Sequence, residues 1–362
     1  MKKYPLTYLV CTAALLGAGL GAAPPAAHPG HRVHLVFPGQ SIQKAVDAAA
    51  PGDTVQLTVG TYRQSVKITT PGLTLRGVGR DTVISPGDTK VAPAADRAAA
   101  TGCAEGGNGI CVVGSKDRDV RGVTVADLTV TGFTSTGLFS MATDGLTVRK
   151  VTAVRNGVWG IAQERSVRAE FRHNTARNNG DAGLFLANTI RSEAGAQDTR
   201  GTVVAHNRLQ GNRIGLTVRR LRNLTVEDNL LAGNCAGMFV VGDENKPKAG
   251  ALTVRGNRVD RNNKSCPKTA RLNAIQGSGI VLTGAEDTLV TRNLITGNAG
   301  TSPMSGGVVL FKSFVGVTSD RNRVTDNVLK DNSPADLVDV ATGKDNTFRG
   351  NDCRASRPAG LC

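Results

Sequence analysis

Short segments with alternating apolar side chains recur along most of the chain. Each has the form apolar-x-apolar, as in Val123-Thr-Val125, and the units that separate them are similar in length except where insertions lengthen them. A glycine opens a second such segment in each unit, as at Gly137 and Gly160. Alternation with a period of two indicates β strands, because the side chains of a strand point to opposite faces in turn.

Asparagine forms two columns when the units are aligned. The first column comprises Asn174, Asn207, Asn229, Asn257, Asn293, Asn322 and Asn351. The second column, later in the same units, comprises Asn179, Asn212, Asn234, Asn262, Asn298 and Asn327. Asparagines stacked at one corner can bond with the backbone there. The pattern therefore predicts an all-β, single-stranded right-handed parallel β-helix of about ten turns.

Three stretches near the start of the repeats are familiar. They are residues 41–55, Ser-Ile-Gln-Lys-Ala-Val-Asp-Ala-Ala-Ala-Pro-Gly-Asp-Thr-Val, residues 59–62, Val-Gly-Thr-Tyr, and residues 73–77, Leu-Thr-Leu-Arg-Gly. They resemble the N-terminal cap and first turns of secreted pectate-lyase-like β-helix repeat proteins. The resemblance implies a short capping helix at about residues 42–50. It also implies a β-helix domain over residues 35–352, with the cap and first turn in residues 35–72.

That superfamily includes lyases, esterases, hydrolases, epimerases and carbohydrate-binding modules, so the fold alone does not define a reaction. Its polygalacturonase-like members carry an Asp-Asp pair and a His between two glycines, and alginate epimerases share a Tyr-Gly-Phe-Asp-Pro-His string. Neither pattern occurs in this sequence. Candidate chemistry must therefore come from the aligned units.

The first 23 residues have the parts of a secretory signal peptide. Lys2 and Lys3 form a basic start, residues 9–20 an apolar run too short for a membrane span, and small residues end the segment. We expect this segment to be removed, leaving a flexible leader at residues 24–34 and a secreted protein.

Six cysteines remain after the signal segment, and an even number is typical of disulfide-bonded exported proteins. The spacing suggests these pairs: Cys103 with Cys111, Cys353 with Cys362 and, as the remainder, Cys235 with Cys266. The second pair closes a C-terminal tail at residues 353–362. Zinc is disfavoured because no two cysteines have Cys-x-x-Cys spacing.

Polar residues form a further column beside the first asparagine column. Unit by unit this column reads Asp127, Lys150, His173, His206, Asp228, Gly256, Arg292, Arg321 and Gly350. The position before it contributes Arg149, Arg172 and Glu227. Both positions should project outward at a corner of the coil, because the neighbouring apolar residues and asparagines point inward.

This corner combines histidines with cations and carboxylates. A histidine can move a proton at neutral pH, and nearby Lys and Arg can hold a uronate carboxylate and stabilise the enolate formed when the C5 proton leaves. We therefore predict His173, His206, Lys150 and Asp228 as catalytic, and Arg149, Arg172, Asp127 and Glu227 as substrate-binding. Two alternatives stay open: a His-His-carboxylate metal site, or corner positions that accept any polar residue.

Insertions and aromatic residues indicate a second place of interest. Insertions occur at residues 191–200, 243–250, 263–275 and 299–305, and long loops on a rigid solenoid commonly build binding clefts. The glycine-led segments carry an outward column of Phe139, Ala162, Phe185, Thr217, Phe239, Val281 and Val309, with Trp159 close by. Such aromatics can stack on sugar rings, or the apolar face can lie under a loop or a partner chain.

The balance of charged residues indicates which kinds of molecule the protein can bind. The chain has 44 Lys and Arg against 29 Asp and Glu, a formal charge of +15. A basic exported protein attracts polyanions such as uronate polysaccharides. Nucleic acid is disfavoured because the arginines are not interleaved with stacking aromatics. We predict no resident cofactor: no loop has the dense Asp-x-Asp-x-Asp pattern of a calcium site, and no Met or Cys cluster suits copper.

The favoured hypothesis is thus a secreted, carbohydrate-active β-helix protein, a lyase or epimerase that acts on an acidic polysaccharide at the His173 and His206 corner. The alternative is a non-catalytic protein that binds polysaccharides or surfaces. The sequence makes no prediction of oligomeric state.

Overall fold

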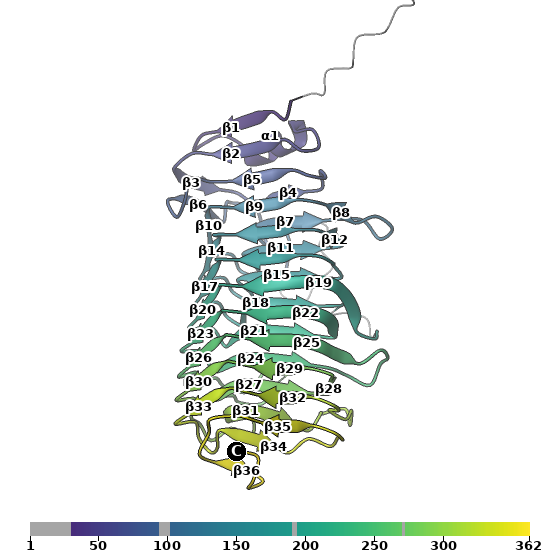
Figure 1. Cartoon of the computed structure of the whole chain (residues 1–362). Helices are drawn as coiled ribbons and strands as arrows, with labels where there is room; N and C mark the ends of the chain where they lie inside the picture. Colours follow the sequence, from purple (N-terminus) through teal and green to yellow (C-terminus); the bar gives the residue numbers. More distant parts are fainter. Residues whose placement is uncertain (1–29, 94–101, 190–193, 270–271) are drawn as a thin grey trace, which may run out of the picture. The chain divides into compact units, whose positions relative to one another are not determined.

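Residues His31–Cys362 form one compact unit. The computed structural model describes residues 30–93, 102–189, 194–269 and 272–362, so the expected signal segment and most of the expected leader lie outside the described residues. Short strands stack turn upon turn, with β1 and α1 at one end of the stack and β36 at the other (Figure 1). The strands of each sheet pair in parallel. The predicted right-handed parallel β-helix is confirmed.

Three sheets make up the coil. The first sheet contains β1 (Val33–Val36), β2 (Thr54–Leu57), β5 (Thr74–Arg76), β9 (Thr124–Ala126), β13 (Thr147–Arg149), β16 (Glu170–Arg172), β19 (Gln197–Ala205), β22 (Leu221–Glu227), β25 (Ala249–Arg255), β29 (Leu289–Thr291), β32 (Arg323–Thr325) and β35 (Thr347–Arg349), with β28 (Ala285–Glu286) beside β25. The second contains β3 (Gly60–Arg63), β6 (Thr82–Ser85), β10 (Thr129–Thr131), β14 (Thr152–Val154), β17 (Thr175–Arg177), β20 (Arg208–Gln210), β23 (Leu230–Ala232), β26 (Arg258–Asp260), β30 (Leu294–Thr296) and β33 (Val328–Lys330).

The third sheet carries the longest series of buried strands. It contains β4 (Val66–Ile68), β7 (Ile110–Val113), β11 (Leu138–Met141), β15 (Ile161–Glu164), β18 (Ala182–Ala187), β21 (Ile214–Arg219), β24 (Ala236–Val241), β27 (Ser278–Thr283), β31 (Gly306–Phe311), β34 (Leu337–Asp339) and β36 (Ser356–Arg357). A small separate sheet pairs β8 (Val120–Arg121) with β12 (Thr143–Asp144). The first sheet has 13 strands, because twelve form one series from β1 to β35 and β28 pairs beside β25.

The core runs along the inside of the coil. Val125, Val148, Phe171 and Val204 occupy equivalent positions in successive turns and are fully buried. Each such side chain contributes about 1.5–3 kcal/mol relative to an exposed one. The period-2 pattern thus gives every turn the same buried positions, and these align with the turns above and below.

Helix α1 (Ile42–Ala48) caps the first turn. The Ser41 hydroxyl accepts a hydrogen bond from the Lys44 amide, and the side chains of Ile42 and Val46 are buried. The helix ends before the expected residue 50, because Ala49 is already extended and the position before Pro51 disfavours helical backbone.

The leader joins the fold earlier than expected. β1 begins at Val33 and pairs with β2. The His34 ring bonds to the Asp53 carboxylate at 2.9 Å, and with two backbone amides this bond lowers the pKa of Asp53 to about 2. Val33 and His34, which the sequence assigned to the leader, are therefore part of the first sheet.

The predicted asparagine columns form hydrogen-bonded ladders. The side-chain oxygen of Asn207 accepts bonds from both the backbone and the side-chain amide of Asn174, at 2.9 and 3.0 Å. The Asn207 side-chain amide in turn donates to the Phe171 carbonyl and to Asn229. Each asparagine thus ties three consecutive turns at a buried corner.

The register predicted for the last turns is wrong by one corner. Asn327, placed in the second column, bonds with Asn293 and Asn351 of the first. Asn322 bonds instead with Asn346, at a corner just before the first sheet. The corner position expected for Arg321 is therefore occupied by Asp326. Because of the extra residues that follow β31, each later asparagine lies one corner earlier in the coil than the alignment predicts.

The predicted disulfides are all present: Cys103 with Cys111, Cys235 with Cys266 and Cys353 with Cys362. The C-terminal tail also contributes strand β36, which pairs with β34. Within the described part of the chain, no helix has the length and apolar character needed to cross a membrane.

Candidate functional site: a cleft over the third sheet

The predicted histidine corner lies between the first and second sheets. His173 and His206 have left-handed backbone, with φ of 57° and 56°, and both side chains are exposed. Their rings stack with centroids 5.0 Å apart and planes within 7°. Lys150, Asp127 and Asp228 adopt the same left-handed conformation in neighbouring turns. The alignment therefore placed these five residues correctly along one edge of the coil.

The residues predicted as substrate-binding form ion pairs that the sequence did not reveal. Arg149 lies 3.5 Å from the Asp127 carboxylate. Arg172 pairs with Glu170 at 3.1 Å. Glu227 pairs with Arg255 at 2.6 Å, and this pair, above all its hydrogen bond, raises the pKa of Arg255. Glu227 and Arg172 are thus engaged by neighbours other than the histidines.

A cleft with a volume of about 1240 Å³ lies elsewhere, over the outer face of the third sheet. Its floor is the aromatic column, held in register as Phe185, Thr217, Phe239 and Val281 on β18, β21, β24 and β27. None of the eight residues predicted as catalytic or substrate-binding is among those that line it. The structure therefore separates the histidine corner from this cleft.

The aromatic side chains are covered rather than fully exposed. Phe185 and Phe239 are 7% and 4% exposed. Trp159 is half-buried and stacks on Phe185, with ring centroids 4.3 Å apart, while its indole nitrogen donates to Asp181 at 3.2 Å. The Thr217 hydroxyl, between the two phenylalanines, has no hydrogen-bond partner among the described residues. The column faces outward as predicted, but loops cover part of it.

One wall of the cleft is formed by residues 264–267, 269 and 272 of the insertion at residues 263–275. Arg213 is buried and donates to the Pro267 carbonyl at 2.7 Å and to the Asn273 carbonyl at 3.2 Å. The disulfide from Cys235 and a two-residue antiparallel bridge between Cys266 and Ile275 hold the base of the loop. The loop is therefore tied to the third sheet at several points.

Charged groups line the cleft beside the aromatic residues. Arg220 is almost completely buried, pairs with Asp243 at 3.2 Å and donates to the Thr189 carbonyl. Arg219 follows Thr217 on the same strand face, and the Lys264 ammonium donates to the Gly211 carbonyl at 3.0 Å. With Arg213, the lining has four basic side chains against the two carboxylates of Asp181 and Asp243.

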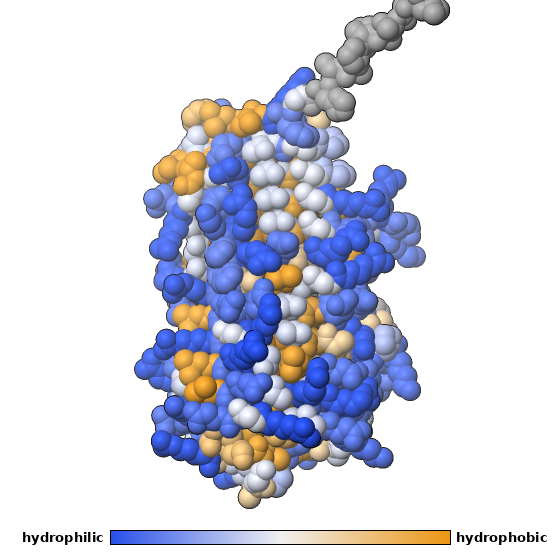
Figure 2. All heavy atoms as spheres, viewed as in Figure 1, coloured by the Kyte–Doolittle hydropathy of each residue, from blue (hydrophilic) through white to orange (hydrophobic). Residues whose placement is uncertain are grey.

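An exposed aromatic residue stands at the rim. Phe314, on the loop after β31, lines the cleft, is 62% exposed and lies 5.8 Å from the Phe311 ring. Figure 2 shows a mainly hydrophilic surface with separate apolar patches, one of them at the end where β1 lies. There Val33, Leu35 and Phe37 are exposed. Phe314 differs from these residues because it borders a cavity.

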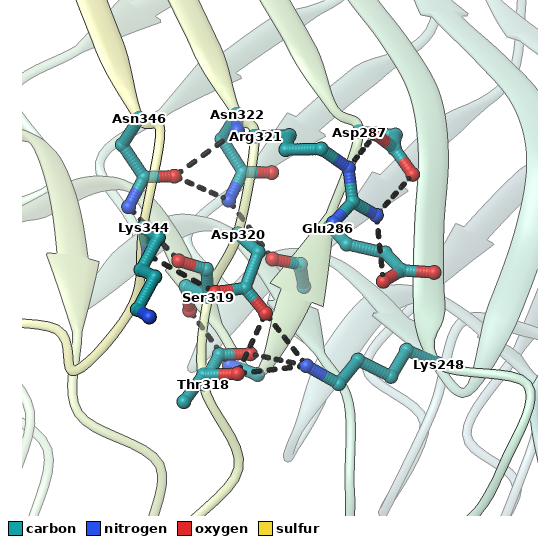
Figure 3. A network of polar contacts seen from close by, with 12 residues as sticks. Lys248, Glu286, Asp287, Thr318, Ser319, Asp320, Arg321, Asn322, Lys344 and Asn346 are labelled. Carbon is teal, nitrogen blue, oxygen red and sulfur yellow. Dashed lines mark hydrogen bonds and ion pairs between the residues drawn. The ribbon is translucent and has the colours of Figure 1, made fainter.

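A polar network ties the loops on one side of the coil (Figure 3). Lys248 bonds to Asp320 at 2.7 Å, and Thr318 donates to the same carboxylate. Burial alone would raise the pKa of Asp320, but these bonds and one from the Lys344 amide outweigh burial and lower the pKa to about 2. Arg321 binds Asp287 and Glu286, and its bond to Asp287 lowers the pKa of that carboxyl group. The network fixes loops that lead from the third sheet to the first.

Sequence reasoning missed most of the polar lining. It singled out Trp159, the aromatic column and the 263–275 insertion, but not Arg213, Lys264, Asp181 or Asp243. The available signal was position: Asp181 and Arg213 directly precede the third-sheet strands β18 and β21, whose outer face carries the aromatic residues.

Two family models match parts of the chain. Residues 100–251 match "Right handed beta helix region", and residues 187–357 match "Periplasmic copper-binding protein (NosD)". The described residues do not fit a copper site: they contain no group of three or more His, Cys, Asp or Glu side chains that could hold a metal ion, and their cysteines are in disulfides.

Solved structures share the fold at low sequence identity. The A-module of a mannuronan C-5 epimerase from Azotobacter vinelandii is 21% identical, with 86% of this chain and 88% of that chain covered and a TM-score of 0.59. A periplasmic alginate epimerase is 12% identical, with coverage of 88% and 83% and a TM-score of 0.52. The DFA-IIIase from Arthrobacter chlorophenolicus A6 is 13% identical, with coverage of 85% and 77% and a TM-score of 0.50. No curated protein sequence matches the chain significantly.

The stacked parallel strands, the asparagine ladders and these matches together define a class. The chain is a right-handed parallel β-helix protein. Its fold is the one that the resemblance to the pectate-lyase-like superfamily predicts.

Proposed function

We propose that the protein binds an acidic polysaccharide in the cleft over the third sheet. The observation that carries the proposal is the combination of aromatic and basic side chains in one cleft, with Trp159 and Phe314 accessible and Lys264 and Arg219 beside them. Flat aromatic rings offer a large rigid contact surface for sugar rings, and Arg and Lys bind carboxylates.

The dimensions of the cleft suit an oligomer. The lining extends from Trp159, just before β15, to Val281 on β27, which crosses five neighbouring strands. Four strand spacings correspond to about 19 Å. That length accommodates several sugar rings in a row, and the formal charge of +15 favours an anionic chain.

Further support comes from the proteins with the same fold and from the cysteines. The structurally similar proteins include epimerases of mannuronan and of alginate. Three disulfides are typical of an oxidising compartment. We therefore infer a secreted protein that meets its polysaccharide outside the cytoplasm.

The cleft supports binding better than turnover. Its two carboxylates are both engaged, since Asp181 accepts a bond from Trp159 and Asp243 pairs with Arg220. No histidine is among the residues that line it. Within the part of the chain that the structure describes, the cleft thus has no evident free base.

The single tryptophan gives a direct test of binding. Saturable change of Trp159 emission is expected when oligouronates are added, and a smaller change with neutral oligosaccharides of equal length. Lys264→Gln should weaken binding about fivefold, as loss of one charge-assisted contact does. The control Lys44→Gln, at an exposed position of α1, removes the same charge away from the cleft and should leave the affinity unchanged. Equal binding of neutral and acidic oligomers would contradict the proposal.

A second candidate function is a lyase or epimerase centred on the corner, which the stacking of His173 on His206 favours. One histidine would take the C5 proton of a uronate, giving an enolate that Lys150 stabilises. Return of a proton to the opposite face gives the epimer, whereas loss of the O4 substituent gives an unsaturated uronate.

Two readouts detect this reaction with pectate, alginate and glycosaminoglycans. They are absorbance of the unsaturated uronate and incorporation of solvent deuterium at C5. Signals that are lost in the His173→Ala/His206→Ala variant would establish turnover at the corner. Absence of both signals, with unchanged binding in the cleft, would favour the non-catalytic alternative.

A further inference from the structure

A second depression adjoins the cleft at the corner between the second and third sheets. It has a volume of about 530 Å³ and is bordered by Arg177, Asn178, Gly211, Gly233, Asp260 and Arg261. We call it the corner groove. Asn178 lines both the cleft and the corner groove. Lys264 of the cleft donates to the carbonyl of Gly211, which borders the groove. The two hollows are therefore contiguous.

Two glycines form the floor of the corner groove, and the Asn178 side chain lies over one of them, Gly211. Gly211 and Gly233 have φ of 68° and 62° at the same corner position that Asn178 and Arg261 fill in neighbouring turns. A Cβ at Gly233 would meet nothing within 4 Å, so the space above this turn is open. The hollow therefore opens above Gly233, beside the Asn178 side chain.

The charges around the groove are unequal. The Asp260 carboxylate is held by Arg261 at 3.0 Å and by the Thr296 hydroxyl at 2.9 Å, and the Arg258 guanidinium lies 3.7 Å away. The Arg177 side chain is exposed and has no hydrogen bond or ion pair among the described residues. The Asp260 carboxylate thus has two guanidinium groups beside it. Arg177 is adjacent to Asn178, which lines both hollows, and its side chain has no such partner among the described residues.

We propose that the polysaccharide chain leaves the cleft over Asn178 and that the corner groove holds its next acidic sugar unit, with Arg177 binding the carboxylate. This rests on the proposed function, because the groove continues the cleft. It makes the ligand a polymer longer than the cleft, since a chain that turns the corner contacts two sheets.

The test compares oligouronates of two lengths, one that fills only the cleft and one several units longer, by Trp159 emission. The longer chain should bind wild-type protein about tenfold more tightly, and Arg177→Ala should remove most of that gain while leaving the shorter chain unaffected. Arg208→Ala is the matched control, because Arg208 is an exposed arginine of the same sheet that does not border the groove.

A second pair of variants fills the groove without changing the corner. Gly233→Asp should also abolish the gain from length, whereas Gly233→Asn should reduce it less. Both residues tolerate the left-handed conformation there, as Asp331 and Asn178 do at equivalent corners. The pair keeps the test valid if the arginine variant is unstable.

The outcomes separate the two proposals. If Trp159→Ala fails to weaken retention of the short chain on an oligouronate column, the proposed function is wrong. If Trp159→Ala weakens it but chain length brings no gain, or Arg177→Ala and Arg208→Ala act alike, only the corner groove assignment is overturned.

Discussion

Trp159 stacks on Phe185 with ring centroids 4.3 Å apart and planes within 12°. The two residues come from consecutive turns, one just before β15 and the other within β18. Asp181 fixes the indole through its N–H, so the outer face of Trp159 is presented to the cleft at a defined angle. Ligand recognition in the cleft therefore depends on a side chain that Phe185 supports from below.

Phe185→Ala should remove the ring on which Trp159 stacks. Loss of the buried ring is expected to lower the free energy of unfolding by about 3 kcal/mol and to shift Trp159 emission to longer wavelength as water reaches the indole. Phe139→Ala is the control: Phe139 lies in the same column but is half-buried and does not line the cleft. Its replacement should leave the emission maximum unchanged. An unshifted maximum in Phe185→Ala would show that the stack does not order Trp159.

The asparagine ladder predicts a large contrast between adjacent residues. Asn229 accepts bonds from the Asn207 backbone and side chain and donates to the Val204 carbonyl. Asn229→Ala leaves these buried groups without partners and should cost about 3 kcal/mol or more. Asp228→Gly, one residue earlier, should cost little, because its left-handed corner already holds Gly256 in the next turn. Urea unfolding of both variants checks the contrast.

Much of the coil could be predicted because each turn repeats the same physical requirements. Alternating apolar residues fix the faces, and asparagine and glycine mark the corners. The predicted register of the last turns was wrong because the asparagines there are ambiguous. Asn322, Asn327 and Asn332 recur at equal spacing, so a shift by one corner preserves the pattern. The pairings of Asn327 with Asn293 and of Asn322 with Asn346 in the structure resolve it.

The cleft was harder to predict than the coil. Its depth depends on where the 263–275 loop lies, and that is set by bonds from Arg213 to two loop carbonyls. These contacts join residues more than fifty positions apart and leave no periodic signal. The histidine corner was detected because it is periodic, whereas the cleft depends on the non-repeating insertions.

Stability should fall in acid partly through Asp320. Its folded pKa of about 2 lies below the ordinary value of 3.8, so the folded protein holds this proton less tightly than the unfolded chain. The stabilisation is complete above the ordinary pKa and is lost as the pH falls through 4 towards 2. Asp320→Asn should therefore flatten the pH dependence of unfolding between pH 5 and 2.

Asp331→Asn is the matched control for this effect. Asp331 is exposed and makes no ion pair among the described residues. Its replacement should leave the slope of unfolding free energy against pH as in the wild type. If Asp320→Asn and Asp331→Asn have equal slopes, the contacts with Lys248 and Thr318 do not hold the Asp320 carboxylate as described.

The Cys235 to Cys266 disulfide should matter to the cleft as well as to stability. It joins Cys235, just before the floor strand β24, to Cys266 in the wall of the cleft across 31 positions of sequence, which predicts a loss of about 3–4 kcal/mol when both cysteines become serine. Because Arg213 and the short bridge at Ile275 remain, the wall should loosen rather than detach, and oligouronate affinity should fall severalfold. Serine replacement of Cys353 and Cys362, which close a tail outside the cleft, should affect unfolding but not affinity. Equal loss of affinity in both double variants would mean that global stability, not the position of the wall, controls binding.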